Sequence, residues 1–250
     1  MSQRKWRIEW FDTIGSTNAY LLAQAQAGAA GGLVAIADHQ SAGRGRLDRT
    51  WESPPGTSLL LSVLVRERLV AGAAHLLTAA MALAGAVAAE RVTGLRPGLK
   101  WPNDLVIDSS KLAGVLAEAD ASAPGGPPGS TAVVIGMGMN LSWPGPPEAG
   151  GTSLEAASGH PVNRDQLVTA LLDELGERLD LLESDEGRTE LFNELTASLV
   201  TLGQAVGVTT PRGVVTGVAD RISPHGLLVV MTEEGEVEIA VGDVEQLRPG

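Results

Sequence analysis

The sequence predicts an α+β protein in which a mixed sheet with helices is followed by a small β barrel. Two patterns support this prediction. Across residues 1–202, apolar β-rich runs alternate with stretches of helical periodicity. From Gly203 onward, the chain changes to short Val-rich strands separated by glycine turns, a pattern typical of a small barrel. We therefore expect two domains, residues 1–202 and 203–250.

Within these domains, alternation and apolar runs predict strands, and side-chain oxygens at N-cap positions predict where helices begin. The expected strands of the first domain are residues 7–11, 33–37, 57–66, 99–107, 112–119 and 133–141. Residues 99–107 and 112–119 should form a hairpin, and 133–141 should break into a glycine-rich turn. The expected helices start at Ser16 or Thr17, near residue 71, at Asn163, and around Leu191. Residues 205–209, 214–222, 226–231 and 237–240 should be barrel strands.

Composition excludes several functional classes. The chain has 250 residues, a net charge of -12 and no cysteine, so general nucleic-acid binding, disulfides and thiolate chemistry are not expected. Its four histidines lie far apart in sequence, which gives little support for a His-rich metal site. The N-terminus lacks a cleavable apolar segment, and the Ala-rich run from residue 71 is interrupted by His75 and Thr78. We therefore expect a cytoplasmic protein without a membrane partner.

A glycine- and arginine-rich segment, Gly43-Arg44-Gly45-Arg46, is the most informative local feature. Glycines let backbone N–H groups approach a ligand closely, and guanidinium groups offer a planar set of donors to carboxylate or phosphate oxygens. The segment therefore suits an anion, although a solvated turn is the alternative if it is taken alone.

Lysine usage singles out a second segment. Only three of the 18 basic residues are lysine, and two of these, Lys100 and Lys111, lie in the run Lys100-Trp101-Pro102-Asn103-Asp104 and the nearby Lys111-Leu112-Ala113-Gly114. Lysine presents a compact ammonium on a flexible stem, which differs from the planar guanidinium that this chain normally uses. These two positions could reflect such a requirement or a chance grouping.

The order of these blocks identifies a family. Gly15-Ser16-Thr17-Asn18, the Gly43 segment, the Lys100 and Lys111 segments, and Gly136-Met137-Gly138-Met139-Asn140 together resemble the biotin protein ligases over essentially the whole chain. The fold that this resemblance implies is a catalytic domain like that of class II aminoacyl-tRNA synthetases with an SH3-like C-terminal barrel. No P-loop is present, and Gly136-x-Gly138 lacks the third glycine of a dinucleotide fingerprint.

The resemblance also implies a reaction. Biotin and Mg-ATP would give biotinyl-5'-AMP, and a lysine of a biotin carboxyl carrier domain, from an acyl-CoA carboxylase or pyruvate carboxylase, would accept the biotinyl group. Lys111, Arg46 and Arg44 would be the catalytic cations, because two anions must meet. The implied set of ligand-binding residues is Ser16, Thr17, Asn18, Gln40, Gly43, Arg44, Gly45, Arg46, Trp51, Asn103, Lys111, Gly114 and Asn140.

Individual roles follow from the same resemblance. Ser16, Thr17 and Gln40 would hold the ureido group of biotin, Asp104 would bind magnesium, and Arg44 and Arg46 would belong to a lid over the adenylate. Trp51 would stack on adenine, with a partly buried core aromatic as an equal alternative. Asn140 would contact adenine or phosphate.

The sequence differs from the family's pattern at one place, and two alternative functions stay open. Leu47-Asp48 stands where the family commonly continues Arg-Gly, which puts any role of these two residues in doubt. A lipoate protein ligase is the alternative enzyme, and a biotin-sensing repressor is the alternative of another class. Because only 15 residues precede Ser16, no N-terminal DNA-binding module is expected, and the ligase should be monofunctional, as a monomer or homodimer.

Overall fold

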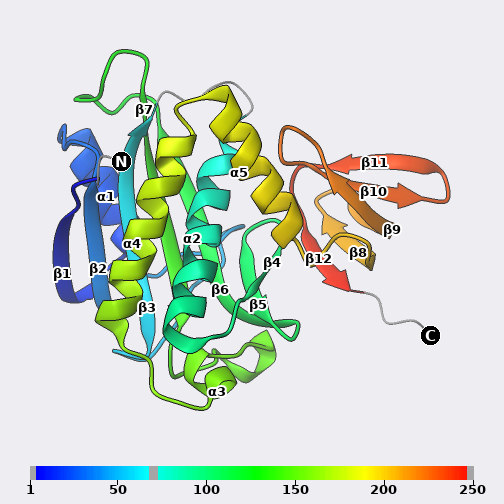
Figure 1. Ribbon diagram of the computed structural model, residues 1–250, viewed down its shortest axis with the longest axis horizontal. Coiled ribbons are helices and arrows are strands. Elements are labelled where there is room, and N and C mark those ends of the chain that lie inside the picture. The colour runs from blue at the N-terminus through cyan, green and yellow to red at the C-terminus, as the bar shows by residue number, and fades with distance from the viewer. Residues whose placement is uncertain (1–3, 68–72, 247–250) are drawn as a thin grey trace.

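The computed structural model describes residues 4–67 and 73–246 and contains two sheets (Figure 1). The larger sheet has seven strands in the order β1-β2-β3-β7-β6-β5-β4. Its strands are β1 (Arg7–Ile14), β2 (Leu33–Gln40), β3 (Ser58–Glu67), β4 (Gly98–Lys100), β5 (Asp104–Ile107), β6 (Ser110–Asp120) and β7 (Thr131–Asn140). β1 and β2 are parallel and the other pairs are antiparallel, so the sheet is mixed as predicted.

Helices cover both faces of this sheet because alternate residues of its strands point to opposite sides. α1 (Thr17–Gln26) connects β1 to β2 and buries Leu21 and Ala25 against Leu33 and Ala35. On the other face, Val34 and its alternate neighbours pack with α2 (His75–Thr93) and α4 (Arg164–Leu181), and α5 (Asp185–Ser198) follows α4. Ser16 and Asn163 cap α1 and α4 as predicted.

α2 is the core helix of the protein. Among the described residues it is the one helix long and apolar enough to cross a membrane, with a mean hydropathy of 1.4. That composition was not expected from the interruptions at His75 and Thr78. However, 67% of its apolar window is buried between the sheet and the neighbouring helices, which accounts for its alanines. Figure 1 shows it between α4 and α5.

Two predictions about the strands are wrong. Residues 99–107 form two short antiparallel strands, β4 and β5, that pair Leu99 with Leu105 around a turn at residues 101–103. The predicted hairpin is confirmed for its second part, because β5 pairs antiparallel with β6. Residues 133–141 do not break into a turn, because β7 continues through both glycines to Asn140. The glycines serve close packing instead: a Cβ at Gly138 would lie 2.5 Å from the Trp51 ring, and one at Gly136 would clash with Asn18.

The C-terminal segment forms a five-stranded antiparallel sheet of order β11-β10-β9-β8-β12. Its strands are β8 (Ala205–Thr210), β9 (Gly213–Ile222), β10 (Leu228–Thr232), β11 (Gly235–Ile239) and β12 (Asp243–Gln246), of which β12 was not predicted. The short helices η1 (Pro147–Ala149) and α3 (Leu154–Ser158) were also missed. The indole N–H of Trp101 donates to Gly226 O at 3.1 Å and joins the two sheets. The boundary at residue 202 stays a prediction.

Candidate ligand-binding and active site

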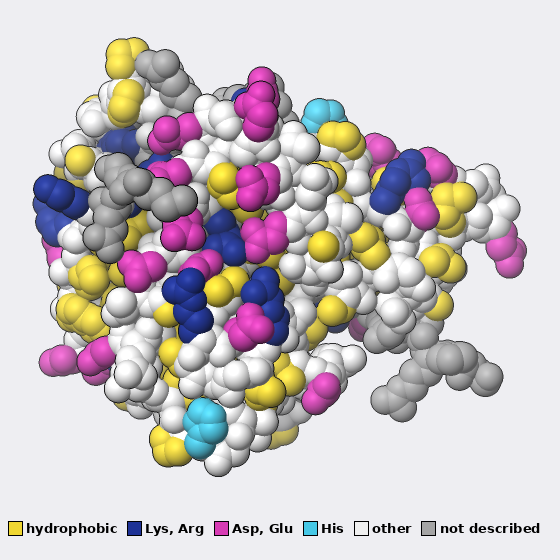
Figure 2. Space-filling view, viewed as in Figure 1, with side chains coloured by type: hydrophobic (Ala, Val, Ile, Leu, Met, Phe, Trp, Pro, Cys, Tyr) yellow, Lys and Arg dark blue, Asp and Glu magenta, His cyan; other side chains and the backbone are white. Residues whose placement is uncertain are grey.

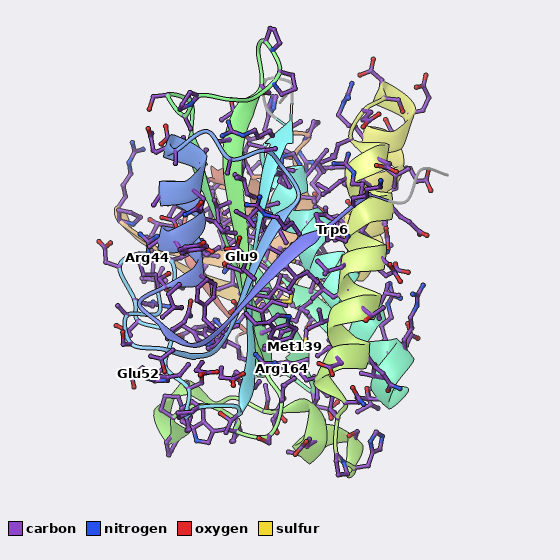
Figure 3. All side chains as sticks on the ribbon, turned by 90° about the vertical axis from the view of Figure 1, so that its left-hand side faces the viewer. Trp6, Glu9, Arg44, Glu52, Met139 and Arg164 are labelled. Atoms are coloured by element: carbon purple, nitrogen blue, oxygen red, sulfur yellow. The ribbon has the colours of Figure 1, made fainter. Side chains whose placement is uncertain are left out.

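A cavity of about 130 Å³ lies where the start of α1, strands β3, β6 and β7, and the Gly43–Trp51 loop meet. Twelve of the residues predicted for the site line it: Ser16, Thr17, Asn18, Gln40, Arg44, Gly45, Arg46, Trp51, Asn103, Asp104, Lys111 and Gly114. Gly43 and Asn140 are not in its lining. In Figure 3, Arg44 and Glu52 lie on the side of the sheet that carries α1, whereas Trp6 lies on the side of α4. The fold therefore brings together motifs that are far apart in sequence.

One end of the cavity is built from neutral polar groups. Gln40 Oε1 accepts from the backbone N–H of Thr17 at 2.7 Å, and Thr17 Oγ1 lies 2.9 Å from the same oxygen. Thr17 Oγ1 also lies 2.7 Å from Ser62 Oγ, and Ser62 donates to Asn18 Oδ1 at 2.6 Å. Thr17, Asn18 and Ser62 are all buried. We call Thr17, Asn18, Gln40 and Ser62 the neutral end of the cavity.

The direction of these hydrogen bonds can be worked out from valence. Asn18 Nδ2 faces two acceptors, Leu116 O at 3.2 Å and Glu118 Oε2 at 2.8 Å, so its oxygen must face Ser62. Ser62 gives its single proton to Asn18. The single hydroxyl proton of Thr17 therefore has two acceptors within reach, Gln40 Oε1 at 2.9 Å and Ser62 Oγ at 2.7 Å. The backbone N–H of Thr17 then holds Gln40 Oε1. Within the described part of the chain, no donor takes the lone pairs of Thr17 Oγ1 and no acceptor takes the amide N–H groups of Gln40, so these groups suit a ligand.

The other end is formed by the glycine- and arginine-rich loop, which folds back on itself as a tight hairpin. Gly45 N donates to Arg49 O at 2.7 Å, and Arg44 pairs with Thr50 as an isolated antiparallel bridge. Leu47 and Asp48 at its tip have φ of 54° and 57°. Two successive residues in the left-handed region are typical of a two-residue hairpin turn, and Asp tolerates that region better than Leu.

The cations of this charged end each have a described partner. Lys111 Nζ lies 2.8 Å from Asp104 Oδ1, Arg44 donates to Glu118 Oε2 at 2.8 Å, and Arg49 pairs with Asp243 of β12. Arg46 instead donates to a neutral amide, Asn103 Oδ1, at 3.0 Å.

Arg46 therefore has the least compensated charge of the four. Burial lowers the pKa of Arg46, and the nearby carboxylates of Asp243 and Asp104 partly offset that effect. A half-buried cation with a neutral partner is suited to an incoming anion, because the anion restores the stabilisation that partial burial removes.

Trp51, Asn140 and Gly43 take different positions. Trp51 lines the cavity, packs against Gly138 and Gly114, and has Lys111 Nζ 5.7 Å from its ring centroid. Asn140 is only 4% exposed and donates to Thr152 O at 2.9 Å and Pro144 O at 3.2 Å. It thus holds the loop around a neighbouring hollow of about 630 Å³. A Cβ at Gly43 would clash with Trp51 O, so glycine permits the base of the hairpin to close.

Among the residues at this site that sequence reasoning missed, four are used in the hydrogen bonds and ion pairs described above. Ser62 interrupts the apolar run of β3, and that interruption was its only local signal. Arg49 lies within the recognised loop, but no role was assigned to it. Glu118 of β6 lies just after the recognised Lys111 segment, but no role was assigned to it. Asp243 belongs to β12, and no feature of its immediate neighbourhood marks it.

Comparison with known proteins agrees with this geometry. The model of the biotin/lipoate A/B protein ligase family matches residues 10–140, and that of the biotin protein ligase C-terminal domain matches residues 201–246. The biotin–acetyl-CoA-carboxylase ligase of Mycobacterium tuberculosis is 36% identical over 258 residues, which cover 97% of this chain and 90% of that protein.

Two further relatives extend the comparison. The bifunctional ligase/repressor BirA of Bacillus spizizenii is 30% identical and covers 94% of this chain, while the chain covers 72% of that protein. The biotin protein ligase of Aquifex aeolicus, solved in complex with biotin and ATP, has a TM-score of 0.81 at 26% identity, with 97% of this chain and 99% of that chain covered. This chain therefore belongs to the biotin protein ligases, within the biotin/lipoate A/B protein ligase family.

Proposed function

We propose that this protein is an ATP-dependent ligase that activates biotin as biotinyl-5'-AMP and transfers the biotinyl group to a lysine of a biotin carboxyl carrier domain. The observation that carries this proposal is one cavity with a neutral, directional hydrogen-bonding end and a cationic end. The names of the relatives, which include biotin–acetyl-CoA-carboxylase ligases and a structure with biotin and ATP, support both substrates.

The neutral end favours biotin over lipoate. A cyclic urea offers N–H donors and a carbonyl acceptor, which match the free lone pairs of Thr17 and the free amide N–H groups of Gln40. The dithiolane ring of lipoate has neither group, so it would leave these buried polar atoms without partners at a cost of about 1–3 kcal/mol each. Ser16 caps α1 beside this end and completes the predicted ureido set.

The charged end suits the first half-reaction. A carboxylate oxygen of biotin attacks the α-phosphorus of ATP, the bond to the bridging oxygen breaks, and pyrophosphate leaves. Two anions must approach, so Lys111, Arg44 and Arg46 would offset their repulsion and the charge of the transition state. Lys111 is placed by its ion pair with Asp104, which keeps the ammonium at the start of β6.

Magnesium would arrive with ATP and neutralise phosphate charge. The described residues hold no cluster of three or more acidic, histidine or cysteine side chains. A single carboxylate nevertheless fits magnesium, which takes most of its ligands from phosphate and water. Asp104 lines the cavity with 22% of its side chain exposed and is the residue we assign to it.

The second half-reaction requires that the adenylate survive until a lysine amine attacks its acyl carbon and AMP departs. The Gly43–Trp51 hairpin would act as the lid that excludes water from the mixed anhydride. Trp51, packed on two glycines, would present its ring to adenine, and Asn140 would support the neighbouring hollow where the remainder of the nucleotide or the acceptor enters.

Partners and location follow from the same set of observations. The relatives' names point to acetyl-CoA carboxylase as the source of the acceptor domain, with pyruvate carboxylase as a further candidate. Figure 2 shows acidic side chains over the face seen there, with basic ones between them, and the net charge is -12. Such a surface disfavours DNA, so we propose a cytoplasmic ligase, monomeric or homodimeric, rather than a repressor.

The test is transfer to a carrier domain. Purified protein, Mg-ATP and a biotin carboxyl carrier domain are incubated with biotin or with lipoate, and the acceptor is analysed by intact mass. We expect modification with biotin, none with lipoate, and none when the acceptor lysine is replaced by arginine. Modification by lipoate alone would establish the rival enzyme, and no modification by either would contradict the proposal.

A further inference from the structure

Glu118 touches both ends of the cavity although it does not line it. Its Oε2 accepts from Asn18 Nδ2 of the neutral end at 2.8 Å and from Arg44 of the hairpin at 2.8 Å. The residue lies on β6, within the seven-stranded sheet, and its side chain is 25% exposed. One carboxylate oxygen on a sheet strand therefore joins the neutral end, which we also call the floor of the cavity, to the Gly43–Trp51 hairpin, which is its lid.

The two contacts of Glu118 differ in chemistry. Asn18 keeps a second acceptor, Leu116 O, and would retain its orientation if Glu118 became a neutral amide. Arg44, in contrast, has an ion pair that depends on the charge of Glu118, and charge-assisted bonds are roughly twice as strong as neutral ones. The link to the lid is therefore the part of the arrangement that needs a carboxylate.

The geometry of Arg44 shows what this link does. One terminal nitrogen of the guanidinium donates to Glu118, while the residue itself lines the cavity. A guanidinium is planar and has five N–H donors in a fixed arrangement. Holding one corner thus orients the remaining donors, and without that hold a side chain that is 42% exposed would sample many rotamers.

We propose that Glu118 is a positioning residue that anchors Arg44, and with it the hairpin, to the floor of the cavity so that the lid retains the adenylate. The inference rests on the proposed function and adds a residue to it. Glu118 acts through Arg44 and Asn18 and does not contact the substrate. The opposite possibility, that Glu118 competes with the ligand for Arg44, predicts changes of opposite sign.

The experiment separates the two contacts by substitution. Glu118→Gln removes the charge and keeps an acceptor for Asn18, whereas Glu118→Ala removes both. Asp120→Asn is the matched control, because Asp120 lies on the same strand and bonds to Ser122 and Gln26 outside the cavity. For each variant we would measure the melting temperature, the Kd for biotin alone, and the rate at which preformed biotinyl-AMP is lost.

We expect Glu118→Gln to speed loss of the adenylate about tenfold, the size of a lost charged hydrogen bond, and to weaken biotin binding less than about threefold. Glu118→Ala should speed adenylate loss about tenfold and also weaken biotin binding about tenfold. Arg44→Gln should speed adenylate loss at least as much as Glu118→Gln, because it also removes a cation that lines the cavity. The double variant should be no worse than Arg44→Gln alone, because Glu118 acts through Arg44. Asp120→Asn should behave as the parent does.

Additive effects in the double variant, unchanged loss of adenylate in Glu118→Gln, or slower loss would each overturn the inference. A purely structural role would lower the melting temperature of Glu118→Gln without the selective effect on adenylate loss, and this too would overturn it. Failure of the proposed function is a separate result: the parent itself would then form no biotinyl-AMP.

Discussion

The neutral and charged ends of the cavity use opposite strategies. At the neutral end, hydroxyl and amide groups of Thr17, Ser62, Asn18 and Gln40 hydrogen-bond to one another. At the charged end, cations are held by carboxylates that come from other parts of the fold, and Arg46 alone among the four has a neutral partner. Hydrogen bonding to biotin and retention of the charged adenylate are thus placed on separate elements: α1 and the sheet for the first, and the Gly43–Trp51 hairpin for the second.

The two ends also differ in how rigidly they are built. Thr17, Asn18 and Ser62 lie on α1 and β3 and are buried, so their geometry is set by packing of the core. The hairpin is attached through side-chain ion pairs, with Arg49 66% exposed. Substitutions at the neutral end should therefore change affinity for biotin, and those at the charged end should change the formation or retention of the adenylate.

The largest effect is expected at Lys111. Lys111→Ala removes a cation from the place where two anions meet, and loss of one such electrostatic group typically costs about 100-fold to 1,000-fold in rate. Biotin-dependent pyrophosphate exchange measures it, with Lys100→Ala, in the neighbouring motif, as the control with a smaller defect. Exchange within a few-fold of the parent in Lys111→Ala would show that the charged end does not depend on this residue.

The second largest effect is expected for Arg46→Gly, which tests whether Arg46 retains biotinyl-AMP. Because Arg46 is the least compensated cation, its loss should release biotinyl-AMP, which labels exposed lysines of any protein. Serum albumin incubated with enzyme, biotin and Mg-ATP, and probed with streptavidin, should be labelled about tenfold more than with the parent, as expected for a lost charged contact. Arg212→Gly, in a turn of the C-terminal sheet, is the control. Equal labelling by enzymes that both form adenylate would remove Arg46 from this role.

Ser62→Ala tests whether the neutral end can be changed without affecting the charged end. The change removes the link between Thr17 and Asn18 and leaves Asn18 Oδ1 without its buried donor, which costs about 1–3 kcal/mol, whereas Thr17 Oγ1 keeps Gln40 Oε1. We expect weaker binding of biotin by calorimetry, with adenylate retention little changed once biotin is saturating. Weakened retention at saturating biotin would mean that the two ends are not separable.

Asp243→Asn should have the smallest effect. Its ion pair with Arg49 connects β12 to the hairpin, but exposed pairs contribute about 0–1 kcal/mol. We expect at most a few-fold rise in the KM for ATP and no change in the Kd for biotin. If Asp243→Asn released as much biotinyl-AMP as Arg46→Gly does, the C-terminal sheet would control the lid.

Local signals explain what the sequence could predict. Ser16 and Asn163 were predicted as N-caps because capping depends on neighbouring residues alone. The turn at residues 101–103 was missed because β4 is only three residues long and too short to show a period. β12 was missed for the same reason, as its four residues contain one apolar side chain.

The residues of the site also fall into those that local motifs could predict and those that only the folded structure reveals. The motif residues could be named in advance because each stands in a recognisable block, and twelve of them line one cavity. Glu118 is 100 residues from Asn18, and Asp243 is 194 residues from Arg49, so their contacts exist only after folding. The glycines of β7 were recognised, but their purpose, close approach of Asn18 and Trp51, required the packed structure.

The roles of the two ends can be tested by exchange of labelled pyrophosphate into ATP by the purified protein, with biotin, lipoate or no acid added. A cavity with a urea-matched neutral end and a cationic charged end predicts exchange that requires biotin and is lost in Lys111→Ala. Exchange that proceeds with lipoate, or that is independent of either acid, would contradict the assignment of the two ends.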